Sequence, residues 1–263
     1  MRIEEARVVS NRDIARAIWK MEVESPLVVQ EVCGPGQFIN IVVSETWDLP
    51  LRRPMSIAGT DGDCLKIIYK VLGEGTRRLS QKVTGEHLNI LGPLGNWFHV
   101  GNKDGGIPTL VGGGVGIAPI LWLHHVLESE NREHAFIMGA ATAEEHFLNH
   151  GPEKGIHITT DDGSAGERGT VMPTLKRLCQ KRHQYTIFAC GPEPMLKAIH
   201  RFSIRNKIPC QMALESYMAC GTEICQGCVI EMKNPNSGEH SYHETYSLVC
   251  GDGPVYNAEE VKL

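Results

Sequence analysis

Val111-Gly-Gly-Gly-Val-Gly-Ile-Ala-Pro119 is the stretch that decides how the middle of this chain folds. Residues 109–111 predict a short buried strand before the glycines, and Pro119 to about Ser129 predict a helix after them. Glycines let a ligand approach the backbone closely, and the start of a helix offers it free amides. The loop is therefore a candidate dinucleotide site through Gly112, Gly114 and Gly116. Proline replaces the last glycine of the Gly-x-Gly-x-x-Gly pattern, so a tight turn without a ligand remains an alternative.

Strands and helices alternate after this loop. The apolar pattern predicts further strands over residues 133–139, 155–160 and 185–190. It predicts further helices over residues 142–149, 172–181 and 192–206. This alternation is typical of parallel βαβ units, so we expect an α/β doubly wound parallel sheet.

Two other segments would meet the glycine loop at the carboxyl edge of that sheet, where such sheets bind nucleotides. Cys190-Gly-Pro-Glu-Pro-Met195 ends one strand and opens a helix, and Asp161 and Asp162 follow the strand before it. Carboxylates at this edge can accept hydrogen bonds from ribose hydroxyls and would repel a 2′-phosphate, so we expect NAD rather than NADP. Two loop aspartates that only cap a turn are the alternative.

The first hundred residues predict β-structure instead. Short apolar segments suggest strands over residues 6–10, 14–24, 38–43 and 65–72, with a turn at residues 11–13. Glycine and proline separate these segments, which favours a closed antiparallel β-barrel. We therefore divide the chain into a barrel (residues 1–100), an α/β domain (residues 101–209) and a small C-terminal domain (residues 210–263).

The C-terminal segment carries cysteines in a specific spacing. Cys220-Gly-Thr-Glu-Ile-Cys225-Gln-Gly-Cys228 is followed later by Cys250. This is the plant-type ferredoxin arrangement, in which four thiolates hold a 2Fe–2S cluster. A four-cysteine zinc site usually has two separate C-x-x-C pairs, and a thioredoxin-like dithiol would leave Cys220 and Cys250 without a role. The scattered cysteines are expected to be small core residues: Cys33, Cys64, Cys179 and Cys210.

Composition argues against several classes of protein. The net charge is −5 and no stripe of Lys or Arg stands out, which argues against nucleic-acid binding. The N-terminal residues lack the apolar core of an export signal, and the longest apolar stretch is too short and too rich in glycine to span a bilayer. We expect a soluble cytoplasmic chain with no membrane partner, whose nine cysteines serve metal or redox chemistry.

Two motifs in the barrel half are weak by themselves. Arg53-Pro54-Met55-Ser56 begins a strand, and Gly73-Glu-Gly-Thr76 follows Ile68-Tyr69-Lys70-Val71. Their order relative to the glycine loop and Cys190-Gly-Pro resembles the ferredoxin–NADP reductase superfamily over essentially the whole chain. With the C-terminal cysteines, the sequence is most similar to the electron-transfer subunits of NAD-dependent (type B) dihydroorotate dehydrogenases.

This resemblance implies FAD in the barrel, NAD on the parallel sheet and a ferredoxin-like 2Fe–2S domain at the C-terminus. It assigns Arg53, Gly75 and Thr76 to the FAD pyrophosphate. It assigns Ser56 to the neighbourhood of flavin N5, and it places the catalytic Cys190 near the nicotinamide. The remaining flavin-binding residues that it implies are Pro54, Met55, Ile68, Tyr69 and Lys70.

The resemblance also implies a partner. This would be an FMN-containing catalytic subunit that oxidises dihydroorotate to orotate in pyrimidine biosynthesis, in a heterotetramer with two copies of each chain. Electrons would then pass from FMN to the cluster, to FAD and to NAD. The sequence departs from the family pattern at Met55, where tyrosine is frequent, at Glu223, where glycine is expected, and in a polar insert at residues 233–246. We expect His240 and His243 of that insert to lie in a solvated loop and not to form a second metal site.

Two other functions remain open at this stage. The chain could be the NAD(P)H reductase subunit of a different dehydrogenase or of a hydrogenase. It could also be a zinc-stabilised nucleotide-binding regulator with no redox role. No substrate site that belongs to the chain alone is identifiable from the sequence.

Overall fold

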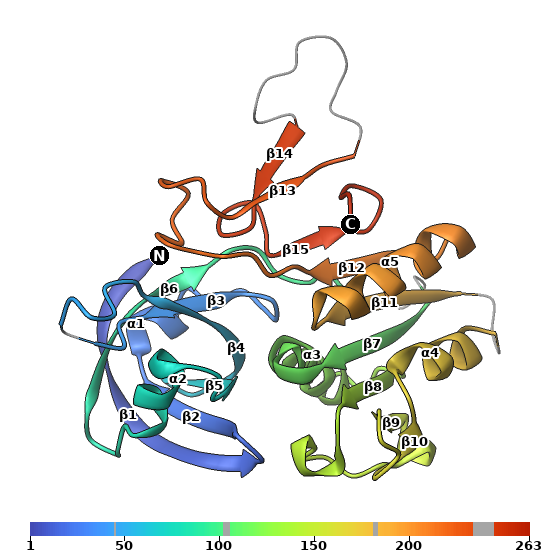
Figure 1. Cartoon of the computed structure of the whole chain (residues 1–263), viewed down its shortest axis with the longest axis horizontal. Coiled ribbons are helices and arrows are strands. Elements are labelled where there is room, and N and C mark those ends of the chain that lie inside the picture. The colour runs from blue at the N-terminus through green and yellow to red at the C-terminus, as the bar shows by residue number, and fades with distance from the viewer. Residues whose placement is uncertain (45, 102–105, 181–183, 234–244) are drawn as a thin grey trace.

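The computed structural model describes residues 1–44, 46–101, 106–180, 184–233 and 245–263. Figure 1 shows a barrel beside a layered α/β part, with the C-terminal segment lying across the top of both. Among the described helices, none combines the length and the apolar character that crossing a bilayer would need.

Six antiparallel strands close the N-terminal barrel in the order β1-β2-β5-β4-β3-β6. They are β1 (Arg2–Ala15), β2 (Ile18–Glu24), β3 (Phe38–Ile41), β4 (Arg53–Asp61), β5 (Cys64–Lys70) and β6 (His87–Leu94). Two short helices, α1 (Pro26–Val29) and α2 (Glu74–Ser80), accompany them. Alternate side chains fill the interior, among them the fully buried Met21, Ile39, Ile57 and Leu65. The predicted barrel is confirmed.

The first hairpin turns later than the sequence suggests. β1 runs through residues 11–13, and the chain reverses at Arg16 and Ala17, where Ala17 has a φ of +57°. The side chain of Asn11 explains why no turn forms there. Its Nδ2 donates to the carbonyl oxygens of Leu79 and Lys82, both at 2.9 Å, so tertiary hydrogen bonds override its preference for a turn.

A seven-stranded sheet forms the second part, in the order β10-β9-β8-β7-β11-β12-β15. Its strands are β7 (Ile107–Gly113), β8 (Ala135–Ala140), β9 (Ile156–Thr160), β10 (Glu167–Arg168), β11 (Tyr185–Cys190), β12 (Cys210–Ala213) and β15 (Val255–Asn257). The pairs are parallel except β12 with β15. The main helices are α3 (Ile117–Ser129), α4 (Val171–Cys179) and α5 (Glu193–Asn206). Leu110 packs in the core with α3, whereas Val111 packs in the core with α4 and α5, so the sheet is covered on both faces as predicted.

The predicted helix over residues 142–149 is wrong. Only the 3-10 turns η2 (Ala143–Glu145) and η3 (Pro152–Lys154) lie in this connection, and η1 (Gly114–Gly116) precedes α3. The acidic side chains of η2 pair with the barrel instead. Arg16 Nη1 lies 2.7 Å from Glu144 Oε2, and Lys70 Nζ lies 2.8 Å from Glu145 Oε1. These contacts between the two parts override the local preference for a longer helix.

The C-terminal segment is joined to the α/β sheet. β12 and β15 extend that sheet beyond residue 209, where the sequence suggested a border, while β13 (Val229–Glu231) and β14 (Tyr246–Leu248) form a separate antiparallel pair. The three-part division by residue number therefore stays a prediction. His240 and His243 fall outside the described residues.

Candidate functional site

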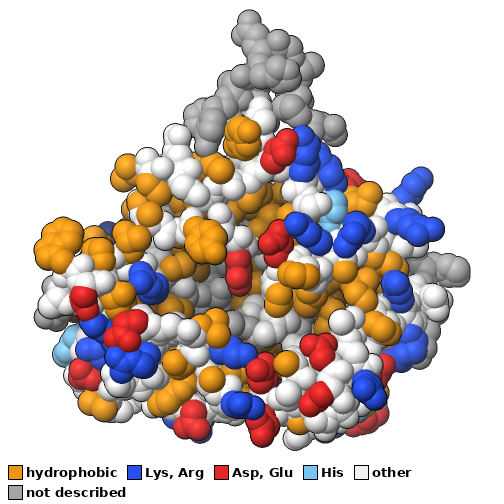
Figure 2. Space-filling view, in the orientation of Figure 1, with side chains coloured by type: hydrophobic (Ala, Val, Ile, Leu, Met, Phe, Trp, Pro, Cys, Tyr) orange, Lys and Arg blue, Asp and Glu red, His pale blue; other side chains and the backbone are white. Residues whose placement is uncertain are grey.

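A cavity of about 330 Å³ lies between the barrel and the segment that leads into the cysteine loop. We call it the flavin cavity, after the predicted residues that line it. Eight of the residues predicted to bind flavin line it together: Arg53, Pro54, Met55, Ser56, Ile68, Tyr69, Lys70 and Thr76. The opposite wall comes from Leu214, Glu215, Ser216 and Met218, none of which the sequence analysis assigned to the flavin. On the face shown in Figure 2, the surface is hollowed where the barrel meets the parallel sheet.

Two adjacent arginines at the start of β4 have different environments. Arg52 is half-buried and donates to the carbonyl oxygens of Asn40 and Asn89 at 3.2 and 3.3 Å, so it ties barrel strands together. Burial lowers the pKa of Arg52. Arg53 borders the cavity and donates through Nη1 to the carbonyl oxygen of Leu51 at 2.6 Å. Arg53 thus presents a planar cation to the cavity, a group that suits a phosphate.

The motif at residues 73–76, which follows β5, packs against Arg53. Gly75 lies outside the cavity lining, and a Cβ there would come within 3.0 Å of Arg53 Nε, so glycine makes room for the arginine. The hydroxyl of Thr76 donates to the carbonyl oxygen of Gly73 at 3.1 Å and accepts from the N–H of Leu72 at 3.0 Å. These two hydrogen bonds stabilise the N-terminus of α2.

Tyr69 contributes little of its side chain to the cavity. Its ring packs in the barrel core, and its hydroxyl donates to Asn11 Oδ1 at 2.9 Å. Burial raises the pKa of Tyr69 above its ordinary value. The strand that carries it therefore faces the cavity mainly through Ile68, Lys70 and the backbone between them.

A second cavity of about 450 Å³ opens at the carboxyl edge of the parallel sheet, and we call it the nucleotide cavity. Its lining includes Gly114 and Asp161, as predicted, together with Gly113, Thr159 and Met195. The predicted residues Gly112, Gly116 and Asp162 are not part of it.

Each of these three residues has a structural role. At Gly112 a Cβ would lie 2.7 Å from Ile117 Cδ1, so glycine lets α3 pack closely on β7. At Gly116 a Cβ would lie 2.5 Å from the backbone nitrogen of Gly191. Glycine therefore lets the glycine loop contact the loop that follows Cys190, and we call these two the nucleotide loops. The carboxylate of Asp162 accepts from the N–H and hydroxyl of Ser164 at 2.9 and 2.6 Å, and these bonds lower its pKa. Asp162 therefore caps a turn, which was the alternative given for both aspartates, whereas Asp161 lines the cavity.

Lys70 lines both cavities, so the two cavities adjoin at this residue. Its Nζ lies 2.8 Å from Glu145 Oε1, which links the barrel to the parallel sheet at the boundary. Cys190, the predicted catalytic residue, is 4% exposed and is absent from the lining of either cavity. Burial, and then the neighbouring Glu215, raise the pKa of the Cys190 thiol. The thiol is therefore neutral and unsuited to attack as a nucleophile.

The four predicted cluster cysteines come together through backbone amides that point at sulfur. The amides of Thr222 and Cys225 donate to Cys220 Sγ, both at 3.4 Å. The amide of Glu223 donates to Cys250 Sγ at 3.2 Å, and that of Cys250 donates to Cys228 Sγ at 3.4 Å. Amides aimed at cysteine sulfurs stabilise thiolates and tune an iron–sulfur centre, so these residues fit a 2Fe–2S cluster.

The protonation of these thiols follows from the same contacts. Partial burial raises the pKa of Cys220, but the amide hydrogen bonds outweigh burial and lower it to about 6. Burial, and then the nearby Cys228, raise the pKa of Cys250 to about 12. Among the other cysteines, Cys210 is buried as expected, but Cys33 is exposed, so the prediction that it packs in the core is wrong.

Three residues of the cysteine loop have a left-handed backbone conformation, and the loop contacts the barrel. Gly221, Glu223 and Gln226 have φ values of +70°, +67° and +53°. Glutamate thus stands at a position whose backbone favours glycine. A Cβ at Gly221 would lie 1.9 Å from Nδ2 of the buried Asn40, which donates to the carbonyl oxygen of Cys220 at 3.4 Å. The loop therefore rests on β3 of the barrel.

Comparison with known protein families agrees with this arrangement. The family model described as the iron-sulfur cluster binding domain of dihydroorotate dehydrogenase B matches residues 215–262. The oxidoreductase NAD-binding domain model matches residues 110–201. The electron transfer subunit of dihydroorotate dehydrogenase B (NAD(+)) from Caldanaerobacter subterraneus subsp. tengcongensis is 36% identical over 258 residues, which cover 97% of each chain. This chain belongs to that family. The corresponding subunit from Geobacillus thermodenitrificans is 37% identical over 270 residues, which cover 99% of this chain and 98% of the relative.

Solved structures show the same architecture as this chain. A chain in the structure of an NADH-dependent reduced ferredoxin-NADP oxidoreductase, described for flavin-based electron bifurcation, is 28% identical, with a TM-score of 0.81 over 98% of this chain and 90% of that one. Phthalate dioxygenase reductase is 17% identical, with a TM-score of 0.63 over 99% of this chain and 96% of that one, which shows a shared fold.

The sites of this dihydroorotate dehydrogenase B family member follow one another in space. The nucleotide cavity adjoins the flavin cavity at Lys70, and Met218, two residues before Cys220, lines the flavin cavity. The sequence analysis identified both ends of this series. It missed the segment at residues 214–218, because single polar and apolar residues between a strand and a loop carry no recognisable motif.

Proposed function

We propose that this chain carries electrons between NAD(H) and a partner dehydrogenase. FAD would bind over Arg53, and a 2Fe–2S cluster would bind to Cys220, Cys225, Cys228 and Cys250. The relatives are named as electron transfer subunits of dihydroorotate dehydrogenase B, so the proposed partner is a catalytic subunit with FMN that oxidises dihydroorotate to orotate. A heterotetramer with two copies of each chain, located in the cytoplasm, belongs to the same proposal.

The observation that carries this proposal is the position of the flavin cavity. It shares Lys70 with the nucleotide cavity on one side, and Met218 leads from it to the cysteine loop on the other. A flavin exchanges a hydride with nicotinamide and single electrons with an iron–sulfur cluster, so it is the group that can join a carrier of electron pairs to a carrier of single electrons.

The residues around the cavities would bind and orient the cofactors. Arg53 would hold the FAD pyrophosphate by charge-assisted hydrogen bonds, and Asp161 would accept from a ribose hydroxyl of NAD. Ser56 would hydrogen-bond the edge of the flavin ring. Cys190, a buried neutral thiol that lines neither cavity, would support the nicotinamide site from beneath its surface without forming a covalent bond.

An apolar surface around the cysteine loop is the proposed partner surface. Tyr217 is 96% exposed and Ile224 is 84% exposed, and Cys225 is also exposed. Figure 2 shows hydrophobic side chains on the C-terminal segment above the barrel. Exposed aromatic and aliphatic residues beside a cluster ligand are typical of the dry centre of an interface, which would bring a second redox centre close to the cluster. Ala219 extends this surface, whereas Met218 is half-buried toward the flavin cavity.

Co-expression with the candidate FMN subunit tests this function. We expect the two chains to elute together in size-exclusion chromatography and to reduce NAD with dihydroorotate. Ile224→Glu should abolish co-elution because it places a charge in the apolar centre, whereas Val83→Glu, at an apolar residue 62% exposed on the barrel, should not. Separate elution of the unmodified chains, with no dihydroorotate-dependent NADH, would reject this partner and favour a different dehydrogenase or a hydrogenase.

A further inference from the structure

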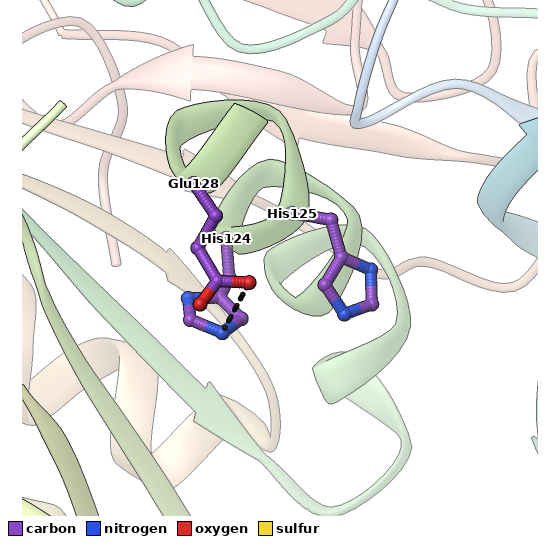
Figure 3. Close-up of side chains that lie close together, drawn as sticks. All are labelled: His124, His125 and Glu128. Atoms are coloured by element: carbon purple, nitrogen blue, oxygen red, sulfur yellow. Dashed lines mark ion pairs between the residues drawn. The ribbon is translucent and has the colours of Figure 1, made fainter. Parts of the chain in front are cut away.

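His124, His125 and Glu128 lie close together on α3, away from the cysteine loop. His124 is buried, whereas His125 and Glu128 are exposed, and one donor atom of each lies within 4.8 Å of the others. Figure 3 shows the three side chains extending from α3, with the imidazole of His124 facing the carboxylate of Glu128. The spacing i, i+1 and i+4 puts His124 and Glu128 on neighbouring turns of one helix. Neither the cofactors nor the partner surface gives these residues a role.

A chain of hydrogen bonds behind His124 fixes which nitrogen of its ring is available. His134 Nδ1 lies 2.8 Å from the carbonyl oxygen of Arg132, which can only accept, so Nδ1 carries the proton. In a neutral His134, Nε2 must then accept. It lies 2.7 Å from His124 Nδ1, so His124 donates there and keeps its lone pair on Nε2. Metal-binding histidines are oriented by this kind of bond at the other ring nitrogen.

The lone pair on His124 Nε2 therefore faces a second acceptor. Glu128 Oε2 lies 3.4 Å from it. When the histidine pair is neutral and the carboxylate ionised, neither atom carries a hydrogen. An extra proton in the histidine pair or a cation between the two atoms would turn this contact into an attraction. A charged N–H···O bond normally measures about 2.7–2.9 Å. Two ligands on a tetrahedral Zn²⁺ with metal–ligand distances near 2.0–2.1 Å lie about 3.3 Å apart, which matches the observed separation.

We infer that His124 Nε2, a ring nitrogen of His125 and the carboxylate of Glu128 form a site for a zinc-like divalent cation. Two imidazoles and one carboxylate suit Zn²⁺ rather than Mg²⁺ or Ca²⁺, which prefer oxygen ligands. The exposed side of the site leaves a fourth position for water. Rotation of the exposed His125 side chain would bring its ring nitrogen to the third position.

The surroundings permit a cation at this place. His125 also borders a groove that α3 makes with the barrel, where Lys66 lies, and Lys20 lines the same groove. Both ammonium groups are paired, Lys66 with Asp61 at 3.0 Å and Lys20 with Glu22 at 2.9 Å. Their partners reduce the repulsion that these lysines exert on a bound cation.

Bound zinc would stabilise the outer end of α3 and the turn that follows it. His124 stacks on Phe136 of β8 with ring centroids 4.7 Å apart, and His134 lies just before that strand. The three ligands all lie on α3, so the cation would hold this helix end together, and His124 would carry that effect to β8 through its stacking on Phe136. Its effect would be on stability and not on the electron path, so it does not depend on the proposed function.

Zinc titration of the purified protein, with its flavin and cluster in place, tests the site. We expect calorimetry to show one site per chain whose affinity falls at least tenfold in Glu128→Gln and in His125→Ala. Glu130→Gln, an exposed glutamate at the end of the same helix, should bind zinc as the unmodified chain does. These variants leave the buried His124 in place, so folding is preserved.

Zinc K-edge X-ray absorption on the same sample separates this site from the cysteines. Nitrogen and oxygen ligands at about 2.0–2.1 Å, without sulfur at about 2.3 Å, would support the inference. Sulfur ligation, equal affinity in Glu128→Gln and Glu130→Gln, or no zinc binding would overturn it. In the last case an extra proton in the histidine pair accounts for the contact with Glu128.

Discussion

The glycine loop at residues 112–116 and the cysteine loop at residues 220–228 both bring backbone close to a cofactor site, but they are held differently. The first is built into the parallel sheet, and Gly116 is packed against the backbone of Gly191. The second lies before β13 and outside the larger sheets, with Cys225 exposed and Glu223 in the left-handed region. The fold therefore preforms the first loop, and we expect the second to depend more on the group that its cysteines bind. Substitutions should accordingly affect stability in the first loop and cofactor content in the second.

The largest effect is expected from Cys225→Ser. Loss of one of four thiolates should abolish the cluster absorbance and the iron content, because serine is a poor replacement for a thiolate ligand. FAD and NAD binding should persist, since Cys225 lines neither cavity. Cys33→Ser, at another exposed cysteine, is the matched control and should keep its iron. Two irons per chain and an unchanged spectrum in Cys225→Ser would contradict the assignment.

Arg53→Ala affects the cavity that lies between the two loops. Removing a charge-assisted phosphate contact should weaken FAD binding by about 1.5–3 kcal/mol. The measurement is the dissociation constant of FAD for deflavinated protein. Arg77→Ala, which removes an exposed cation paired with Glu74 on the nearby helix α2, should bind FAD normally. Equal FAD affinity in both variants would show that Arg53 has been given the wrong role.

Gly116→Ala tests whether the first loop is preformed by packing. Its Cβ would come within 2.5 Å of backbone atoms that cannot rotate away, so the free energy of unfolding should fall by about 1–3 kcal/mol. At Gly114 a Cβ meets nothing within 4 Å, and Gly114→Ala should lose about 1 kcal/mol from its φ of +55° alone. Urea unfolding of both variants makes the comparison. A smaller loss in Gly116→Ala than in Gly114→Ala would argue against close packing of the two nucleotide loops.

The smallest effect is expected from Asp161→Asn. Removing one carboxylate from the nucleotide cavity should reduce the preference for NADH over NADPH by about 1 kcal/mol, roughly fivefold. Steady-state reduction of an artificial acceptor with each nucleotide measures the preference. Asp162→Asn should leave it unchanged, because that side chain binds Ser164. If the unmodified chain prefers NADPH, the assignment of Asp161 is wrong.

Sequence patterns predicted the elements whose structure is determined locally. The cysteine spacing, the strand over residues 185–190 and the helix that follows it needed no tertiary information, and the structure has β11 and α5 at these places. The errors lie where side chains bind distant elements. Asn11 bonds to residues 79 and 82 instead of making a turn, and Glu145 pairs with Lys70 of the barrel instead of continuing a helix.

Sequence patterns also could not separate residues of the same type by role. Arg52 and Arg53 are adjacent, but only the structure shows that Arg52 bonds to barrel carbonyls while Arg53 borders the flavin cavity. Asp161 and Asp162 differ in the same way. Glu215, on the opposite wall of the flavin cavity, belongs to no motif. Such distinctions depend on contacts between residues far apart in the sequence.

Electron passage from NADH to the cluster through the flavin cavity is tested most directly by anaerobic reduction of the protein with and without FAD. Deflavinated protein that retains its iron should show no electron paramagnetic resonance signal of a reduced cluster when NADH is added, but should show it with dithionite. Restoring FAD should restore the signal with NADH. Reduction of the cluster by NADH in the absence of FAD would contradict the placement of the flavin between the nucleotide and the cluster.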